Sequence, residues 1–338
     1  MDKTVRHLAG QRLMLGFNGT RFNAELERII DRFQAGGIIL FRQNIRSPDQ
    51  VARLCADAQA FAASCGRPPL FVAVDQEGGV VSRLPAPFTR FDGNPFIRTR
   101  EQAQRFARIT ARELQEAGIN MNLAPVVDVV PDHTDSIMET RAFPGNAQTV
   151  ADLGAAVIQT LQSAGVMAVA KHFPGIGRTV LDSHHLLPVL DVDTADLQAA
   201  DLVPFDAAVR ADVAGIMVSH ILCPRQDPGW QASLSVIIAR DMIRQGLGFN
   251  GLVLTDDLDM KAIAHDMDTC MGRILAAGID LALICHQGPN IETAFDALVR
   301  RLEADQESWD SGRASLERIY RYKQAYLGWH RPDRSGGT

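Results

Sequence analysis

The chain has 338 residues, of which 46% are hydrophobic, and carries a formal net charge of -6. This composition is typical of a globular protein with a large core, and the dispersed lysines and arginines offer no basic surface that would hold nucleic acid. No segment has the roughly 18 consecutive apolar residues of a membrane span, and the polar amino terminus lacks the apolar run of a signal peptide. We therefore expect a cytoplasmic protein that binds neither nucleic acid nor membranes, and the sequence leaves its oligomeric state open.

Eight short runs rich in valine, isoleucine and leucine alternate with longer segments of helical pattern. The runs cover residues 12–17, 36–41, 70–75, 120–128, 166–172, 214–220, 251–257 and 281–286. Such runs are typical of parallel strands that are buried on both faces. Eight βα units in succession favour a closed (β/α)8 barrel of the TIM type, because a doubly wound sheet would more often show a glycine-rich phosphate loop after its first strand.

Helices are expected between these runs, and three of them end at a glycine. They cover residues 101–117, 151–164 and 238–245, and are followed by Gly118, Gly165 and Gly246. Glycine readily adopts the left-handed backbone conformation that ends many helices. Since no linker or repeat divides the chain, we expect one barrel domain over residues 1–330 and a flexible polar tail over residues 331–338.

The cysteines give no sign of a metal site or of a disulfide. They are odd in number, form no C-x-x-C pair and have no histidines at zinc-ligand spacing; they are Cys55, Cys65, Cys223, Cys270 and Cys285. We expect small side chains, mostly buried, in a protein of a reducing compartment. No metal or other cofactor is predicted.

Ionisable residues recur at the last positions of the predicted strands. They are Asp75, Asp128, Lys171, His172, His220, Asp256, Asp257 and His286. One such residue would more often be a solvated strand end, but the carboxyl ends of barrel strands meet at one face, where active sites form. The set therefore predicts a site for a polar substrate, and on this pattern alone an aldolase or a metal hydrolase fits as well.

The segment from Lys171 to Pro188 leaves a strand and presents Asp182 and His184 on a long loop with two glycines. At this spacing the carboxylate can bind the imidazole and fix its tautomer, and an imidazole with a pKa of roughly 6.5 can donate and accept protons near neutral pH. An isolated pair would more often be a turn cap beside an exposed histidine. A metal site formed by His172, His184 and His185 has no matching carboxylate spacing.

Two further motifs carry carboxylates to the predicted barrel mouth. In LVLTDDLDM, Asp256 follows a buried strand and could attack an anomeric carbon, as the nucleophile of a retaining glycosidase does. For Asp257 we favour a position at the N-terminus of a helix. In VDQEGGVVSRL, Asp75 and Arg83 flank a Gly-Gly turn that we expect to approach a ligand. Sugar hydroxyls need such acceptors and forked donors, although an ion pair that only shapes the loop would look the same.

At these residues the sequence resembles glycoside hydrolase family three, and within it the single-domain β-N-acetylhexosaminidases that act on cell-wall muropeptides. The resemblance covers nearly the whole chain and rests on GGIILF, VDQEGGVVSRL, NLAPVVDV, ETRAFPG, KHFPGIGRT, LDSHHLLP and LTDDLDM, in family order. It implies an incomplete or distorted barrel and a retaining mechanism, with Asp256 as nucleophile, His184 as acid/base and Asp182 as the partner of His184. It also implies that the N-acetylglucosamine ring is bound by Asp75, Arg83, Arg141, Lys171 and His172.

The sequence departs from this family at two positions of the loop motif. The common form reads K-H-F-P-G-H-G-D-T, and Ile176 and Arg178 stand here where His and Asp are common. The anchoring of the loop and its contacts with the leaving group are therefore expected to differ. A family-three β-glucosidase and an N-acetylglucosaminide phosphorylase are the enzymatic alternatives, and a barrel that binds muropeptides without turnover is the alternative from another class.

Overall fold

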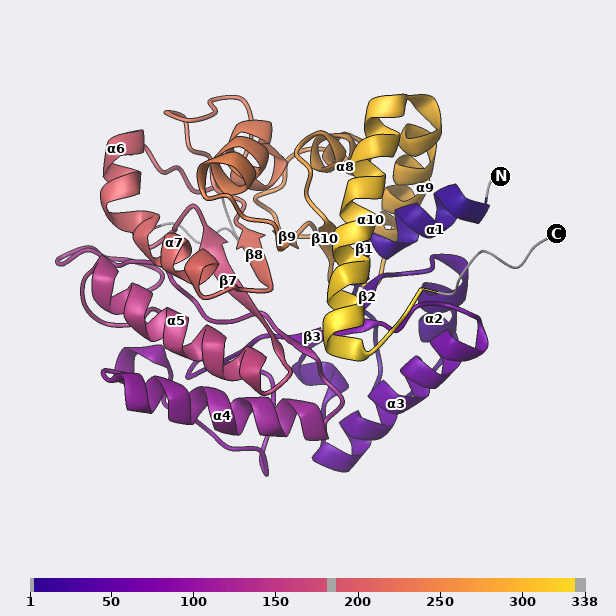
Figure 1. The fold of residues 1–338 in the computed structure, drawn as a ribbon, viewed down its shortest axis with the longest axis horizontal. Helices are drawn as coiled ribbons and strands as arrows, with labels where there is room; N and C mark the ends of the chain where they lie inside the picture. The colour runs from indigo at the N-terminus through magenta and orange to yellow at the C-terminus, as the bar shows by residue number, and fades with distance from the viewer. Residues whose placement is uncertain (1–2, 181–186, 332–338) are drawn as a thin grey trace.

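The structure, a computed structural model, describes residues 3–180 and 187–331. Its eight parallel strands close into a barrel in the order β1-β10-β9-β8-β7-β6-β3-β2 (Figure 1). They are β1 (Leu13–Leu15), β2 (Gly37–Leu40), β3 (Phe71–Val74), β6 (Met121–Asn122), β7 (Met167–Phe173), β8 (Gly215–Val218), β9 (Leu252–Asp257) and β10 (Leu281–Ile284). Each of the eight predicted runs overlaps one barrel strand, which confirms the (β/α)8 fold. The barrel is closed, so the incomplete form that the resemblance implied does not occur.

The strands are apolar on both faces because each face packs against a separate layer of the core. Side chains that point into the barrel, among them Met14, Phe71 and Leu254, form one buried cluster. Side chains that point outward form a second cluster with the surrounding helices. This two-sided burial explains why the strands read as continuous apolar runs rather than as alternating patterns.

Helices surround the barrel and follow the strands in sequence (Figure 1). The longer ones are α1 (Lys3–Gln11), α3 (Pro48–Ser64), α4 (Arg100–Glu116), α5 (Ala147–Ser163), α7 (Val203–Arg210), α8 (Met267–Ala276), α9 (Pro289–Ala304) and α10 (Gln306–Leu327). The short elements are α2 (Ala24–Glu27), η1 (Arg28–Arg32), η2 (Arg42–Asn44), η3 (Asn94–Phe96), α6 (Thr194–Asp196), η4 (Leu197–Asp201) and η5 (Ala232–Leu234). None of the described helices is long and apolar enough to cross a membrane.

The predicted helix ends hold for two helices and fail for a third. Gly118 and Gly165 follow α4 and α5 with positive φ angles of 74° and 83°, as glycine at this position favours. The third segment is a π-helix, η6 (Ile237–Gly246), which includes Gly246. Its wider winding carries the chain onward, and the left-handed residue is Gly248, with a φ of 64°.

Helix α10 closes the amino-terminal end of the barrel. Its Ile319 belongs to the interior cluster, and the fully buried Lys323 donates a hydrogen bond of 2.8 Å from Nζ to Gln11 Oε1 of α1. Lys323 Nζ also lies 5.1 Å from the centre of the Phe71 ring. Helix α10 therefore covers the floor of the barrel, and the barrel interior opens at the opposite end, formed by the carboxyl ends of the strands.

Candidate active site

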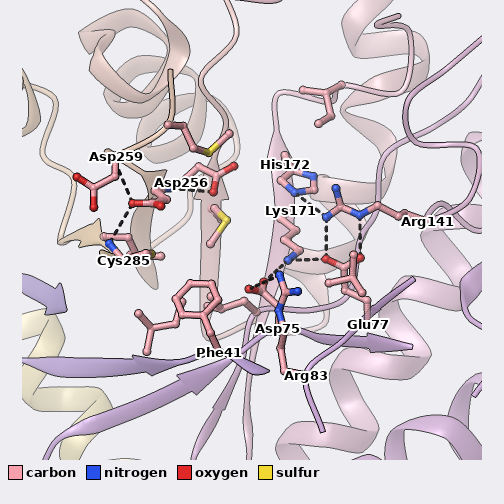
Figure 2. A pocket seen from close by; sticks show the side chains of 18 of the residues that line it. Phe41, Asp75, Glu77, Arg83, Arg141, Lys171, His172, Asp256, Asp259 and Cys285 are labelled. Carbon is pink, nitrogen blue, oxygen red and sulfur yellow. Dashed lines mark hydrogen bonds and ion pairs between the residues drawn. The ribbon is translucent and has the colours of Figure 1, made fainter. Parts of the chain in front are cut away.

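A cavity of about 500 Å³ opens at the carboxyl ends of the barrel strands. Its floor is apolar and includes Ile39, Leu123, Met217 and Leu283, while its walls are charged. The structure brings into this one cavity six of the residues predicted from sequence: Asp75, Arg83, Arg141, Lys171, His172 and Asp256. Figure 2 shows Asp256 on one side and the other five on the opposite side. The charged walls thus have two parts that face each other.

The opposite wall, which we call the cation wall, consists of Arg83, Arg141 and Lys171 with their carboxylate partners. Lys171 Nζ lies 2.7 Å from Asp75 Oδ1, and Arg83 Nη2 lies 3.8 Å from Asp75 Oδ2. Burial acts to lower the pKa of Lys171, but Asp75 and Glu77 outweigh it and raise that pKa. Lys171 therefore stays a cation and a hydrogen-bond donor within the cavity.

Glu77, to which the sequence suggested no role, joins two of these cations. It belongs to β4 (Gln76–Gly78) and is 2% exposed. Its carboxylate accepts hydrogen bonds from Arg141 Nε at 3.0 Å and Nη2 at 2.7 Å, and it lies 2.7 Å from Lys171 Nζ. Burial alone would raise the pKa of Glu77, but Lys171 and Arg141 lower it to about 2. Glu77 is thus ionised and fully paired.

Asp128 contacts both the imidazole and the backbone N–H of His172. The buried Asp128 Oδ2 lies 2.8 Å from His172 Nδ1, and Asp128 Oδ1 accepts the backbone N–H groups of His172 and Ile176 at 3.3 and 2.8 Å. Arg141 Nη2 lies 3.4 Å from His172 Nε2, and an arginine can only donate. Both partners therefore assign the proton of a neutral His172 to Nδ1, which leaves Nε2 as an acceptor that faces the cation wall.

The hairpin of β4 and β5 (Val81–Ser82) positions Arg83. Gln76 Oε1 accepts the backbone N–H groups of Arg83 and Leu84 at 2.9 and 3.2 Å. The turn needs glycine at position 79, where φ is 61° and a Cβ atom would lie 2.9 Å from the carbonyl oxygen of Asp92. The glycine turn therefore packs closely against the neighbouring loop, and its approach to a ligand stays a prediction.

Asp256, near the end of β9, faces the cation wall across the cavity (Figure 2). Burial acts to raise its pKa, but His220, His172 and Lys171 and the Asp257 backbone N–H favour the ionised form, and the pKa is lowered. Within the described part of the chain Asp256 has no ion-pair partner. An ionised carboxylate that is not held in an ion pair can act as a nucleophile.

Asp257 does not begin a helix, so the helix N-terminal role expected for it is wrong. Its Oδ1 accepts the backbone N–H groups of Asp259 and Cys285, both at 3.0 Å, and so ties β9 to the end of β10. Asp257, Asp259 and His286 offer ligand atoms that all lie within 4.8 Å of one another, a grouping that could hold a metal ion. His286 Nδ1 lies 3.3 and 3.5 Å from oxygens of the two carboxylates.

The two residues that depart from the family motif lie in the loop after β7, and one of them anchors it. Ile176 lines the cavity, and Arg178 Nε lies 2.9 Å from Oδ2 of the buried Asp201. Burial raises the pKa of Asp201 although Arg178 favours its ionised form. The predicted Asp182 and His184 fall within residues 181–186, outside the described residues.

Sequence reasoning missed the pairing role of two carboxylates in this site. Glu77 lies two residues after Asp75, and alternate residues of an extended segment point the same way, so the spacing could have indicated it. Asp128 was identified as a strand-end residue, but its partner His172 lies 44 positions further along the chain. No local pattern indicates that contact.

Comparison with known proteins identifies the family. The profile of the Glycosyl hydrolase family 3 N terminal domain matches residues 4–322. The chain belongs to glycosyl hydrolase family 3. The beta-hexosaminidase of Pseudomonas aeruginosa (strain LESB58) is 37% identical over 296 residues, which are 85% of this chain and 86% of that protein. The beta-hexosaminidase of Thiobacillus denitrificans is 36% identical over 321 residues, with coverages of 91% and 86%. The protein is therefore a glycoside hydrolase.

Solved structures of family 3 enzymes superpose on the barrel. A β-N-acetylglucosaminidase from Paenibacillus sp. str. FPU-7 has a TM-score of 0.92 at 34% identity; the match covers 100% of this chain and 66% of that one. NagZ from Neisseria gonorrhoeae in complex with N-trifluoroacetyl-D-glucosamine has a TM-score of 0.74 at 26% identity, with coverages of 91% and 98%. The family 3 barrel therefore accounts for nearly all of this chain.

Proposed function

We propose that this family 3 hydrolase is a retaining β-N-acetylhexosaminidase that removes terminal β-linked N-acetylglucosamine. The observation that carries the proposal is the ionised Asp256 facing a wall of paired cations across a cavity of about 500 Å³. Uncharged sugar hydroxyls suit such a wall, because Lys171, Arg141 and Arg83 donate while Asp75 and His172 Nε2 accept. The names of the relatives support the same substrate class.

In the proposed mechanism, Asp256 attacks the anomeric carbon and forms a glycosyl ester as the glycosidic C–O bond breaks. The departing oxygen takes a proton from His184, for which Asp182 is the proposed partner. A water molecule then attacks the same carbon and gives its proton to His184, and the ester bond breaks. Two inversions restore the β configuration and release free N-acetylglucosamine.

The substrate can be identified by a panel of aryl glycosides. We expect turnover of the N-acetylglucosaminide, with weaker turnover of the N-acetylgalactosaminide and little of the glucoside. Addition of phosphate distinguishes hydrolysis from phosphorolysis, because only the latter yields a sugar phosphate. A wild-type enzyme that prefers the glucoside would refute the proposed substrate.

The mechanism can be tested through Asp256. The D256A variant should lose turnover of the aryl N-acetylglucosaminide while its unfolding temperature stays near that of the wild type. Mass spectrometry of the wild type treated with a slow fluorinated substrate should find the sugar on the peptide that contains Asp256. Substantial residual activity in D256A, or a label on another peptide, would exclude this nucleophile.

We further propose that the leaving group is a cell-wall muropeptide, released during peptidoglycan recycling in the cytoplasm. Lys261 supports an anionic leaving group: it lines the cavity, is exposed and has no ion-pair partner among the described residues. The five cysteines are free thiols, which suits a reducing compartment.

This leaving-group preference can be tested at Lys261. K261M should lower kcat/KM for a carboxylated aryl N-acetylglucosaminide several-fold and leave the neutral aryl compound unchanged. R98M, which removes another exposed cation, serves as the control. Equal effects of K261M on both substrates would contradict the anionic leaving group.

A further inference from the structure

We propose that Glu77 is a positioning residue that sets both the orientation and the net charge of the cation wall, and that it thereby selects sugar hydroxyls over anions. The inference rests on the proposed function, because it assigns the specificity of the same cavity. Glu77 lies beside Arg141 and Lys171 in the lining of the cavity and joins the two (Figure 2). Its side chain is almost completely buried, so its effect on a substrate passes through these two cations.

The contacts of Glu77 fix the orientation of both partners. Arg141 Nε and Nη2 donate to different oxygens of the carboxylate at 3.0 and 2.7 Å, a bidentate arrangement that holds the guanidinium plane. Lys171 Nζ lies 2.7 Å from the same oxygen that accepts Arg141 Nη2. Lys171 also contacts Asp75 at 2.7 Å, so its ammonium is held between two carboxylates and points one way.

Within the wall, the charge of Arg141 is balanced by Glu77 and not by Asp75, the other carboxylate. Arg83 and Lys171 both contact Asp75, but for Arg141 Glu77 is the ion-pair partner within the described chain. Without Glu77, Arg141 would keep its charge and would have no carboxylate of the described residues within ion-pair distance. An unpaired arginine in such a site is a binding site for an anion.

This balance has a consequence for specificity. A hydroxyl group accepts a hydrogen bond from a cation that is already paired, whereas an anion gains little there because Glu77 repels it at close range. Glu77 therefore disfavours sulfate, phosphate and sugars with an acidic group at the positions that Arg141 and Lys171 contact. It allows two cations to serve as donors for an uncharged ring.

The test compares E77Q with E113Q, a matched variant of a buried glutamate on α4. Glu113 accepts hydrogen bonds from the backbone N–H and the hydroxyl of Thr89 and does not line the cavity. We expect E77Q to lower kcat/KM for an aryl N-acetylglucosaminide by one to two orders of magnitude, mainly through KM, and E113Q to leave it unchanged. Sulfate, which cannot serve as a nucleophile here, should become a competitive inhibitor of E77Q at millimolar concentration and should not inhibit the wild type.

The possible outcomes separate the proposals. If the wild type does not turn over the substrate, the proposed function fails; if it does and E77Q equals it in KM and in resistance to sulfate, only the role of Glu77 fails. A structural role alone would lower the unfolding temperature and kcat/KM without making sulfate an inhibitor, and would also overturn the inference.

The conservative variant E77D covers the case in which E77Q does not fold. E77D keeps the charge but shortens the side chain by one methylene group, so we expect a lower kcat/KM and no inhibition by sulfate. Wild-type kcat/KM in E77D would overturn the role in orientation, and inhibition of E77D by sulfate would overturn the role in charge.

Discussion

Replacement of Asp128 by asparagine tests whether the tautomer of His172 matters for the reaction. The two side chains have the same shape, and the amide oxygen of the introduced asparagine would keep the two backbone N–H groups that Asp128 Oδ1 accepts. The amide NH2 would then face His172 Nδ1, which lies 2.8 Å from Asp128 Oδ2. Because NH2 cannot accept a proton donor, Nδ1 must become the acceptor and the proton must move to Nε2.

The expected loss of kcat/KM in D128N follows from the hydrogen bonds of His172 that are lost or reversed. One charge-assisted hydrogen bond is lost, and His172 Nε2–H would now face the donor Arg141 Nη2 at a distance of 3.4 Å. Losses of this kind amount to about 2–3 kcal/mol, which corresponds to roughly 30- to 150-fold in kcat/KM. The assay is turnover of an aryl N-acetylglucosaminide between pH 5 and 8, with E113Q as the control and thermal unfolding to verify the fold. A D128N variant within threefold of the wild type at every pH would refute the reasoning.

Three further predictions follow from buried charges. Burial lowers the pKa of Lys323 well below its usual value, so below about pH 10.4 the unfolded chain binds a proton that the folded chain lacks. The stability of the wild type relative to K323M should therefore rise by about 1.4 kcal/mol per pH unit as the pH approaches roughly 10.4. Chemical denaturation measures this difference. R178A should cost about 3 kcal/mol at pH 8 because it leaves Asp201 buried and unpaired. The loss should shrink as the pH falls, because burial raises the pKa of Asp201 and so favours its protonated form; equal losses at pH 8 and pH 4 would contradict this. The lowered pKa of Asp256 should place the acid limb of the kcat/KM profile below the usual aspartate range, and an acid limb above pH 5 would show that another group controls it.

The fold could be predicted from sequence because each barrel strand is buried on both faces and most of the predicted helices end in a recognisable way. The run over residues 251–257, for example, became β9 (Leu252–Asp257), and Gly118 ended α4 with a positive φ angle. The π-helix η6 could not be predicted. Its hydrogen bonds span five residues, as from the N–H of Leu247 to the carbonyl of Met242, and apolar periodicity alone does not distinguish that winding from an α-helix.

Several charged residues that line the cavity could be predicted from the sequence, but their partners could not. Asp75, Lys171 and Asp256 lie at strand ends, and the barrel brings all strand ends to one face. The contacts of Glu77 with Arg141 and of Arg178 with Asp201 span 64 and 23 positions. They depend on how loops cross the barrel mouth, which no local pattern encodes.

The position of α10 bears on how the chain reaches its native state. The first and last barrel strands, β1 and β10, pair with each other, and α10 covers the barrel floor through contacts such as Lys323 with Gln11, 312 residues apart. During synthesis β1 has no lasting partner on that edge until almost the whole chain has left the ribosome. Contacts of such sequence separation form slowly and leave unpaired strand edges exposed in the meantime. Ring closure is therefore a late event, and the facing edges of β1 and β10 stay unpaired until it occurs.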